Sequence, residues 1–249
     1  MPSPEPCRAR VPARPAREDV AVSGGVSARE PSRSSDRDPS PRFDEGFRRQ
    51  LEALVRWRRD VRRFRHDPLD EALLEHLVRV AAHAPSVGHS QPWRFVEVAD
   101  KARRNAVRDD FRRCNQAALA QYEGERAHLY ASLKLAGLDD APTHLAVFAD
   151  RATHAGHGLG RRTMPATLDH SVVLAIHTFW LAARTYGIGV GWVSILDPEI
   201  VRAVLDVPAT WHLIAYLCVG YPDEEHCDPE LERHGWQERE GSTSVILRR

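Results

Sequence analysis

Residues 171–186 (SVVLAIHTFWLAARTY) constrain the fold most, because apolar side chains occupy nearly every face of the helix that they predict. A helix of this kind is usually buried on all sides inside a domain. Three short apolar segments predict strands around it, at residues 144–150, 188–195 and 213–219. Strands and helices alternate irregularly, which is typical of a mixed α+β domain.

The remaining elements follow from similar patterns. Apolar residues recur at helical spacing in 47–57 and again in 68–84, where Pro85 stops the second helix. Residues 93–99 predict a further strand, and the polar stretch 101–134 is mostly helical.

Residues 1–42 differ in composition from the rest of the chain. They hold 8 of the 17 prolines and 7 serines, and they contain no Leu, Ile or aromatic residue. Such a segment buries too little apolar surface to offset the entropy lost on ordering, so we expect a disordered extension. Residues 43–240 then form one domain, and residues 241–249 form a C-terminal tail.

Charge and cysteine content argue against several classes of protein. The 35 basic residues balance the 35 acidic ones, so nothing points to a nucleic-acid or membrane-surface partner. The four cysteines are scattered and form no CxxC pair, which disfavours a disulfide scaffold and a structural zinc site. No apolar run approaches the ~18 residues of a membrane span, and the N-terminus lacks the apolar core of a secretory signal. These features predict a soluble cytoplasmic protein.

Two familiar patterns carry little weight. Residues 187–191 (GIGVG) resemble a dinucleotide fingerprint, but they precede a predicted strand instead of joining a strand to a helix. His154 and His157 form a close pair in a glycine-rich loop without a neighbouring cysteine or carboxylate. A solvated loop explains this pair better than a zinc site, and we expect no metal.

The first informative cluster is residues 58–64 (RRDVRRF), directly after the first predicted helix. Its four guanidinium groups offer planar forks of donors that suit a phosphate. Asp60 lies among these arginines, so we expect its pKa to be lowered and its carboxylate to be held in one orientation. A solvated run of charges is the alternative.

Two further clusters contain small residues. Residues 84–93 (APSVGHSQPW) expose backbone N–H groups between a helix end and a strand, where a flat ligand can approach closely. Residues 187–198 (GIGVGWVSILDP) place alternating glycines in a strand, which usually marks the close approach of a ligand or another backbone. Taken singly, the two clusters also fit a loop that ends a helix and a bulged core strand.

Taken in order and followed by Gly220-Tyr221-Pro222, these clusters resemble the nitroreductase-like flavoprotein superfamily. Residues 132–142 (SLKLAGLDDAP), 157–165 (HGLGRRTMP) and 205–222 narrow the resemblance to the 5,6-dimethylbenzimidazole synthases, the BluB family. The resemblance spans about residues 43–239. It implies an α+β, nitroreductase-like fold, with a central mixed sheet flanked by helices, in an intertwined homodimer that binds FMN at its interface.

The resemblance also assigns roles to individual residues. Asp60 stands where most flavin reductases of the superfamily carry a serine, as in the synthases, and His89 stands where they carry an asparagine. Both departures weaken the interpretation as a generic nitroreductase. The implied contacts are Arg58, Arg59 and Arg62 to the phosphate and ribityl chain, Pro85, Ser86 and Gly88 to the flavin from the partner subunit, Val193 and Ser194 near flavin N5, Arg239 as a second phosphate contact, and residues 159–165 as part of a lid.

The activity that this resemblance implies is the oxygen-dependent fragmentation of reduced FMN (FMNH2) for the lower ligand of cobalamin. FMN is then the substrate, O2 the co-substrate, and a separate flavin reductase the electron supplier. Asp60 is the candidate acid/base, and Ser194 is the candidate for bonding the N5 side of the ring. The alternatives are an NAD(P)H-dependent FMN nitroreductase or quinone reductase, and a flavin-binding carrier or regulatory module.

Overall fold

The computed structural model describes residues 40–135, 137–239, 246 and 249. Residues 1–39 of the disordered extension expected at 1–42, and most of the tail expected at 241–249, lie outside the described residues. The elements are α1 (Glu45–Trp57), α2 (Glu71–Ala81), η1 (Val87–His89), β1 (Trp93–Glu97), α3 (Lys101–Leu119), α4 (Gly124–Ser132), β2 (Thr143–Asp150), η2 (Ala155–Gly158), α5 (Thr167–Thr185), β3 (Gly189–Val193), α6 (Pro198–Leu205), β4 (Trp211–Gly220) and α7 (Glu230–Arg233).

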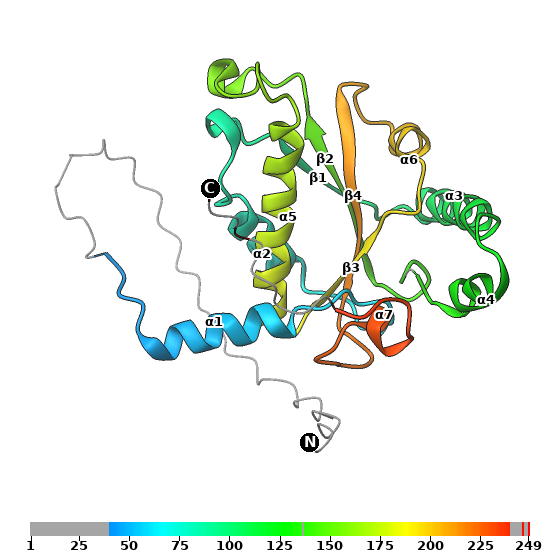
Figure 1. Cartoon of the computed structure of the whole chain (residues 1–249). Helices are drawn as coiled ribbons and strands as arrows, with labels where there is room; N and C mark the ends of the chain where they lie inside the picture. The colour runs from blue at the N-terminus through cyan, green and yellow to red at the C-terminus, as the bar shows by residue number, and fades with distance from the viewer. Residues whose placement is uncertain (1–39, 136, 240–245, 247–248) are drawn as a thin grey trace.

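A four-stranded antiparallel sheet divides the molecule, with its strands in the order β1-β2-β4-β3. The helices α2 and α5 lie on one face of the sheet, and α3, α4 and α6 lie on the other (Figure 1). Apolar side chains fill both layers, since one buried cluster joins α2 and α5 to the sheet and a second joins α3 and α6 to it. The α+β fold class expected from the sequence is confirmed, but the expected mixed pairing of the sheet is wrong for its four strands, which all pair antiparallel. A parallel contact occurs at the isolated bridge between Asp60 and Val190, where residues 58–64 run beside β3 without forming a strand.

Aspartate caps fix where several helices begin. The side chain of Asp44 accepts the N–H of Phe47, and Asp70 and Asp100 make the equivalent contact at the start of α2 and α3. A cap of this kind stabilises a helix by about 1 kcal/mol. The helical stretch predicted over 101–134 is confirmed, with a break at residues 120–123 that divides it into α3 and α4.

Burial of two helices differs from the prediction. The helix α5 was expected to be buried all round, but Val173 and Leu174 are 40% and 45% exposed. On α1, Phe47 and Leu51 are 43% and 44% exposed, and none of its residues is buried, because the helix extends away from the body of the molecule (Figure 1). An apolar pattern shows that a face avoids water, but it does not show whether the same chain covers that face.

Within the described ranges, no helix has the length and apolar character that crossing a bilayer requires.

Candidate functional site

The arginine-rich segment 58–64 lies along the outer edge of β3. Asp60 pairs with Val190 in a parallel bridge, and the N–H of Val61 donates to the carbonyl of Val190 at 3.1 Å. A Cβ at Gly191 would overlap the carbonyl oxygen of Val61, so only glycine allows the two backbones to lie this close. The alternating glycines of 187–191 thus leave room for the backbone of residues 58–64, which carries the arginines.

Asp60 is held from two sides. Its Oδ1 accepts the N–H of Trp192 at 2.8 Å, and its Oδ2 accepts Nε of Arg62 at 3.1 Å. The prediction of a lowered pKa is wrong. Burial raises the pKa of this carboxyl, the bonds from Trp192 and Arg62 act against that rise, and the negative charge of Glu230 adds to it. The single orientation expected for the carboxylate is present, and 36% of the side chain is exposed.

The arginines of this segment are fixed by neighbouring groups. The guanidinium of Arg58 lies 4.9 Å from the centre of the Trp180 ring on α5, and Trp180 in turn donates from Nε1 to the carbonyl of Arg59 at 3.3 Å. Nε of Arg59 donates to the carbonyl of Cys227 at 3.0 Å, and Nη1 of Arg62 donates to the carbonyl of Lys134 at 3.2 Å. Two backbone carbonyls and the Trp180 ring therefore hold the side chains of these three arginines in fixed orientations.

Positive charge accumulates at Arg59. The pKa of its guanidinium is lowered by burial, then by the positive charges of Arg58 and Arg239. Arg239 therefore lies near enough to interact with Arg59, although 180 positions separate them in the sequence. An anion placed among these groups would relieve their mutual repulsion, which suits a phosphate.

A cleft lies beside this cation cluster, between the end of α1, α5 and the segment that follows β4. Arg59, Asp60 and Arg62 line it, together with Glu230 of α7. Glu230 is 9% exposed and pairs with Arg63 at 3.3 Å and with Arg62 at 4.0 Å. A second carboxylate therefore lies on the other side of the arginine that holds Asp60.

The loop with Pro85, Ser86 and Gly88 lies elsewhere. The N–H of Val87 donates to Oγ of Ser171, near the start of α5, whereas the arginines contact Trp180 near its end. Nine residues of helix separate the two positions, a distance of ~13.5 Å along the axis. In one chain, therefore, the two groups of expected flavin contacts lie toward opposite ends of α5.

The same loop packs against the expected lid. Gly88 has a φ of +56°, and a Cβ there would lie 3.0 Å from the carbonyl oxygen of Leu159 and 3.1 Å from that of Gly156. Leu159 and Met164 are 72% and 60% exposed. The segment 159–165 therefore covers the Gly88 loop while presenting apolar side chains outward.

Val193 and Ser194 end the strand that also holds Asp60. Val193 is 4% exposed and packs in the α3–α6 layer, while Ser194 is exposed just beyond the strand. The structure therefore brings Arg59, Asp60 and Arg62 together on the cleft, with Arg58 and Arg239 near Arg59, and it places Val193 and Ser194 directly after Trp192, whose N–H bonds to Asp60. His154 and His157 belong to η2 and its N-terminal cap, and no group of three or more possible metal ligands exists among the described residues.

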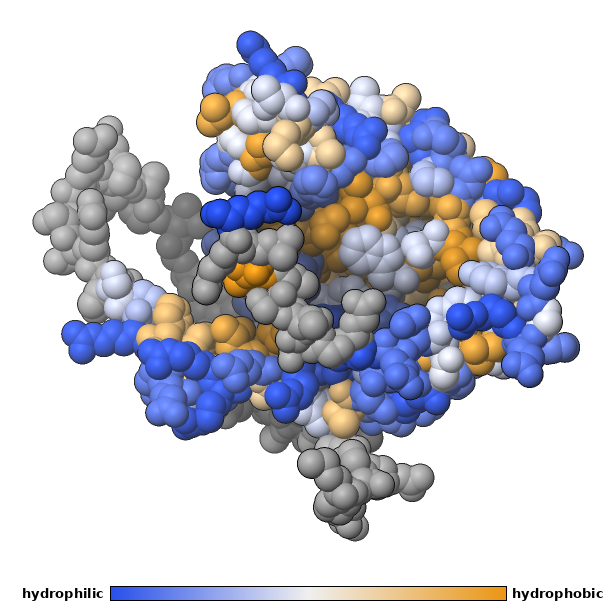
Figure 2. All heavy atoms as spheres, in the orientation of Figure 1, coloured by the Kyte–Doolittle hydropathy of each residue, from blue (hydrophilic) through white to orange (hydrophobic). Residues whose placement is uncertain are grey.

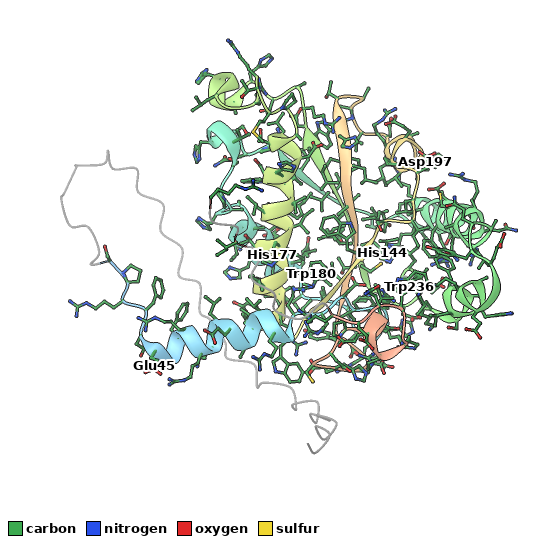
Figure 3. All side chains as sticks on the ribbon, viewed as in Figure 1. Glu45, His144, His177, Trp180, Asp197 and Trp236 are labelled. Atoms are coloured by element: carbon green, nitrogen blue, oxygen red, sulfur yellow. The ribbon has the colours of Figure 1, made fainter. Side chains whose placement is uncertain are left out.

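Trp180 and Glu230 shape the site but were not found from the sequence. Trp180 looked like one more apolar residue of a buried helix, and Glu230 lies in an acidic stretch far from residues 58–64 in the chain. Figure 3 shows Trp180 directed from α5 toward the edge strand of the sheet. Only the fold brings these side chains to the arginines.

Comparison with known proteins gives consistent matches. The model of the nitroreductase family matches residues 55–221. The 5,6-dimethylbenzimidazole synthase of Rhodospirillum rubrum is 62% identical over 199 residues, which cover 80% of this chain and 94% of that protein. The synthase of Rhodobacter capsulatus is 49% identical over 196 residues, covering 79% of this chain and 95% of that protein.

A solved structure agrees in fold. Oxidised iodotyrosine deiodinase bound to FMN and 3-iodo-L-tyrosine has a TM-score of 0.61 at 25% identity, over 80% of this chain and 97% of that one. These matches confirm the fold and the family expected from the sequence. The chain belongs to the nitroreductase family and, within it, to the family of the 5,6-dimethylbenzimidazole synthases.

Proposed function

We propose that this protein converts reduced FMN and O2 into 5,6-dimethylbenzimidazole and erythrose 4-phosphate, for the lower ligand of cobalamin. The observation that carries the proposal is the carboxylate of Asp60, fixed between the N–H of Trp192 and Arg62 at the edge of a cleft that Arg59 and Arg62 also line. Relatives that are 62% and 49% identical over most of their length bear the name of this synthase.

The residues present suit FMN. Burial, and then the positive charges of Arg58 and Arg239, lower the pKa of Arg59, and this cluster of guanidinium groups is a suitable place for the phosphate. The exposed Ser194 offers a hydroxyl at the end of β3, and Arg62 offers donors next to Asp60. When bound, the reduced flavin would supply the electrons that reduce O2. Its dimethylbenzene ring, the two nitrogens attached to that ring and C1′ would become the benzimidazole, and the pyrimidine part of the isoalloxazine would be released.

Asp60 has the properties of a proton carrier for this reaction. Cleavage of the ribityl C1′–C2′ bond requires a proton to be removed next to the sugar chain. A carboxyl whose pKa is raised by burial accepts a proton more readily than an exposed aspartate does, and the partial exposure of Asp60 leaves it within reach of a ligand. Arg62 holds this carboxylate in place, and Ser194 bonds the N5 side of the ring.

The site is completed by a second copy of the chain in this proposal. Pro85, Ser86 and Gly88 would then reach the flavin from the partner, which explains why they lie far along α5 from the arginines of their own chain. The exposed apolar side chains of α1, together with Val173 and Leu174 of α5, supply a face for that partner. Figure 2 shows apolar surface gathered in a recess below the projecting part of the molecule that contains η2, and hydrophilic residues surround this recess.

The dimer is tested by placing a charge on each side of α1. Leu51→Asp puts a carboxylate on the apolar face, and we expect it to yield monomers by analytical ultracentrifugation and to weaken FMN binding by at least tenfold. Ala53→Asp puts the same charge on the opposite side of the helix and serves as the matched control. Equal behaviour of the two variants contradicts this part of the proposal.

The reaction is tested by incubating the protein in air with FMN kept reduced by a separate reductase, and by detecting 5,6-dimethylbenzimidazole by mass. Product above a control without the protein supports the proposal. Absence of product, with bound FMN bleached by NAD(P)H alone, identifies an NAD(P)H-dependent nitroreductase or quinone reductase instead. Flavin binding without either result identifies a carrier.

A further inference from the structure

The chain between β3 and α6 carries Ser194, and its hydroxyl makes no hydrogen bond within the described part of the protein. Its direction is therefore set by the backbone on either side. On one side, Val193 is anchored in the sheet opposite Tyr216. On the other side, Asp197 lies three residues later and is the N-cap of α6, where its side chain accepts the N–H groups of Glu199 and Ile200.

A buried carboxylate on α3 holds this second anchor. Oδ2 of Asp110 accepts the backbone N–H of Asp197 at 2.8 Å, and the Asp110 side chain is 2% exposed. Its Oδ1 accepts Nε and Nη2 of Arg113 at 3.2 and 2.6 Å. Figure 3 shows Asp197 between α6 and α3, the helix that carries Asp110.

The contact between Asp110 and the N–H of Asp197 has the features of a stable structural interaction. A carboxylate this deeply buried is costly unless it is paired, and both oxygens of Asp110 are satisfied, one by a guanidinium and the other by the backbone N–H. Arg113 is 56% exposed, so its side chain reaches in from the surface to neutralise the charge. Asp110 thus ties α3 to the backbone beyond the strand that leads into Ser194.

We propose that Asp110 is a positioning residue of the flavin reaction, because its bond to the N–H of Asp197 fixes the 194–197 segment and thereby aims the Ser194 hydroxyl at the flavin. This inference rests on the proposed function. A supporting group of this kind matters because small displacements of a reacting group lower rates strongly.

Three variants test the inference. Asp110→Ala removes the acceptor. Asp110→Asn keeps an oxygen for the N–H of Asp197 and loses only the charge, while Arg113 keeps its ion pair with the Asp197 carboxylate at 3.7 Å. Asp109→Ala is the matched control on the next position of α3, where the 71%-exposed side chain pairs with Arg112 at the surface.

The first measurement is amide hydrogen exchange of residues 194–197 in the protein without flavin. We expect Asp110→Ala to raise the exchange rate of the Asp197 amide at least tenfold, and Asp110→Asn and Asp109→Ala to leave it near that of the unmodified protein. Unchanged exchange in Asp110→Ala overturns the inference whatever reaction the protein catalyses.

The second measurement is the fraction of consumed FMNH2 that becomes 5,6-dimethylbenzimidazole instead of returning to FMN. We expect Asp110→Ala to lower this fraction about ten- to a hundredfold, with recovery in Asp110→Asn. In a Ser194→Ala background, Asp110→Ala should lower it no further, because the two residues act through one group. An equal loss in both backgrounds overturns the inference. If the unmodified protein makes no benzimidazole, the proposed function fails, and hydrogen exchange alone decides the role of Asp110.

Discussion

At the open edge of the sheet, Asp60 keeps a charged partner and a path to solvent, whereas His144 and Tyr216 are sealed under the α3–α6 face. Nδ1 of His144 lies 2.9 Å from the Tyr216 hydroxyl oxygen, and the two side chains are 2% and 0% exposed. Burial lowers the pKa of His144 to about 4 and raises that of Tyr216, so the pair stays neutral. Burial also raises the pKa of Asp60, but Trp192 and Arg62 oppose that rise.

Burial favours the neutral form of each group, and access to solvent decides whether the group can exchange protons with a ligand. The His144–Tyr216 pair can do so only if the fold opens, so its protonation is linked to unfolding and not to a bound molecule. Asp60 is 36% exposed beside a cleft, so its raised proton affinity is available to a bound molecule. This difference explains why a perturbed pKa alone does not identify a functional residue.

Replacing Asp60 should produce the largest effect. Asp60→Asn keeps the shape and an acceptor for the N–H of Trp192, but it cannot take up a proton. We expect the rate of benzimidazole formation to fall about 10²- to 10⁴-fold with FMNH2 binding largely intact. The measurement is product formation under saturating FMNH2, alongside a titration of flavin binding. Asp139→Asn, a 71%-exposed carboxylate that pairs with Arg108, is the control, and a near-normal rate in Asp60→Asn would falsify the acid/base role.

The sealed pair should instead govern how stability depends on pH. In the unfolded chain His144 takes up a proton near its ordinary pKa of 6.5, whereas in the folded protein it does so only near 4. The unfolded state therefore binds more protons between these values, so stability is full above pH 6.5 and is lost as the pH falls toward 4, by about 3 kcal/mol.

The double variant His144→Phe/Tyr216→Phe removes both polar groups at once and should flatten this part of the curve. Urea unfolding between about pH 4.5 and 7.5 measures the change. His128→Gln, at an exposed histidine on α4, is the control and should keep the slope. An equal slope in the double variant and the unmodified protein would show that other groups cause the loss.

The approach of residues 58–64 to β3 depends on Gly191. In Gly191→Ala, the new methyl group meets the carbonyl of Val61, which separates the two backbones and moves Asp60 away from the N–H of Trp192. We expect a loss of about 1–3 kcal/mol in the free energy of unfolding, together with weaker FMN binding.

Gly124→Ala is the control that distinguishes steric overlap at Gly191 from the effect of backbone strain. Gly124 has a φ of +56° and open space around it, so the substitution is strained but lies against no other group. It should cost about 1 kcal/mol and leave FMN binding unchanged. If both variants bind FMN equally well, close backbone approach at Gly191 is not what holds the arginine segment in place.

The glycine pattern shows how much of the site could be predicted from the sequence. The spacing in 187–191 predicted that another backbone or a ligand comes close, and the structure identifies a backbone that carries Asp60. The direction of the Asp60 pKa could not be predicted, because arginines next to it in the chain suggested a lowered value while its burial depends on β3 and α7. Likewise, the pairing of Asp110 with Asp197 joins residues 87 positions apart, and no local pattern encodes it.

The smallest of the expected effects is a change in the pKa of Asp60 when Glu230 is replaced. Asp60 is faced by Arg62 of its own segment, the N–H of Trp192 on β3, Cys218 on β4 and Glu230 on α7. Of these, Glu230 adds negative charge and also lies 4.0 Å from Arg62, the cation that stabilises ionised Asp60.

Glu230→Gln should therefore lower the pKa of Asp60, both by removing a negative charge and by leaving Arg62 to Asp60 alone. The limb of the pH–rate profile that Asp60 governs should move to lower pH, with the maximal rate largely kept, because Glu230 is not assigned a contact with the flavin. Glu232→Gln on the same helix is the control and should leave the profile in place. A profile that moves to higher pH in Glu230→Gln would mean that Glu230 acts mainly by holding Arg62 beside Asp60, and that its own charge matters less than the position of that arginine.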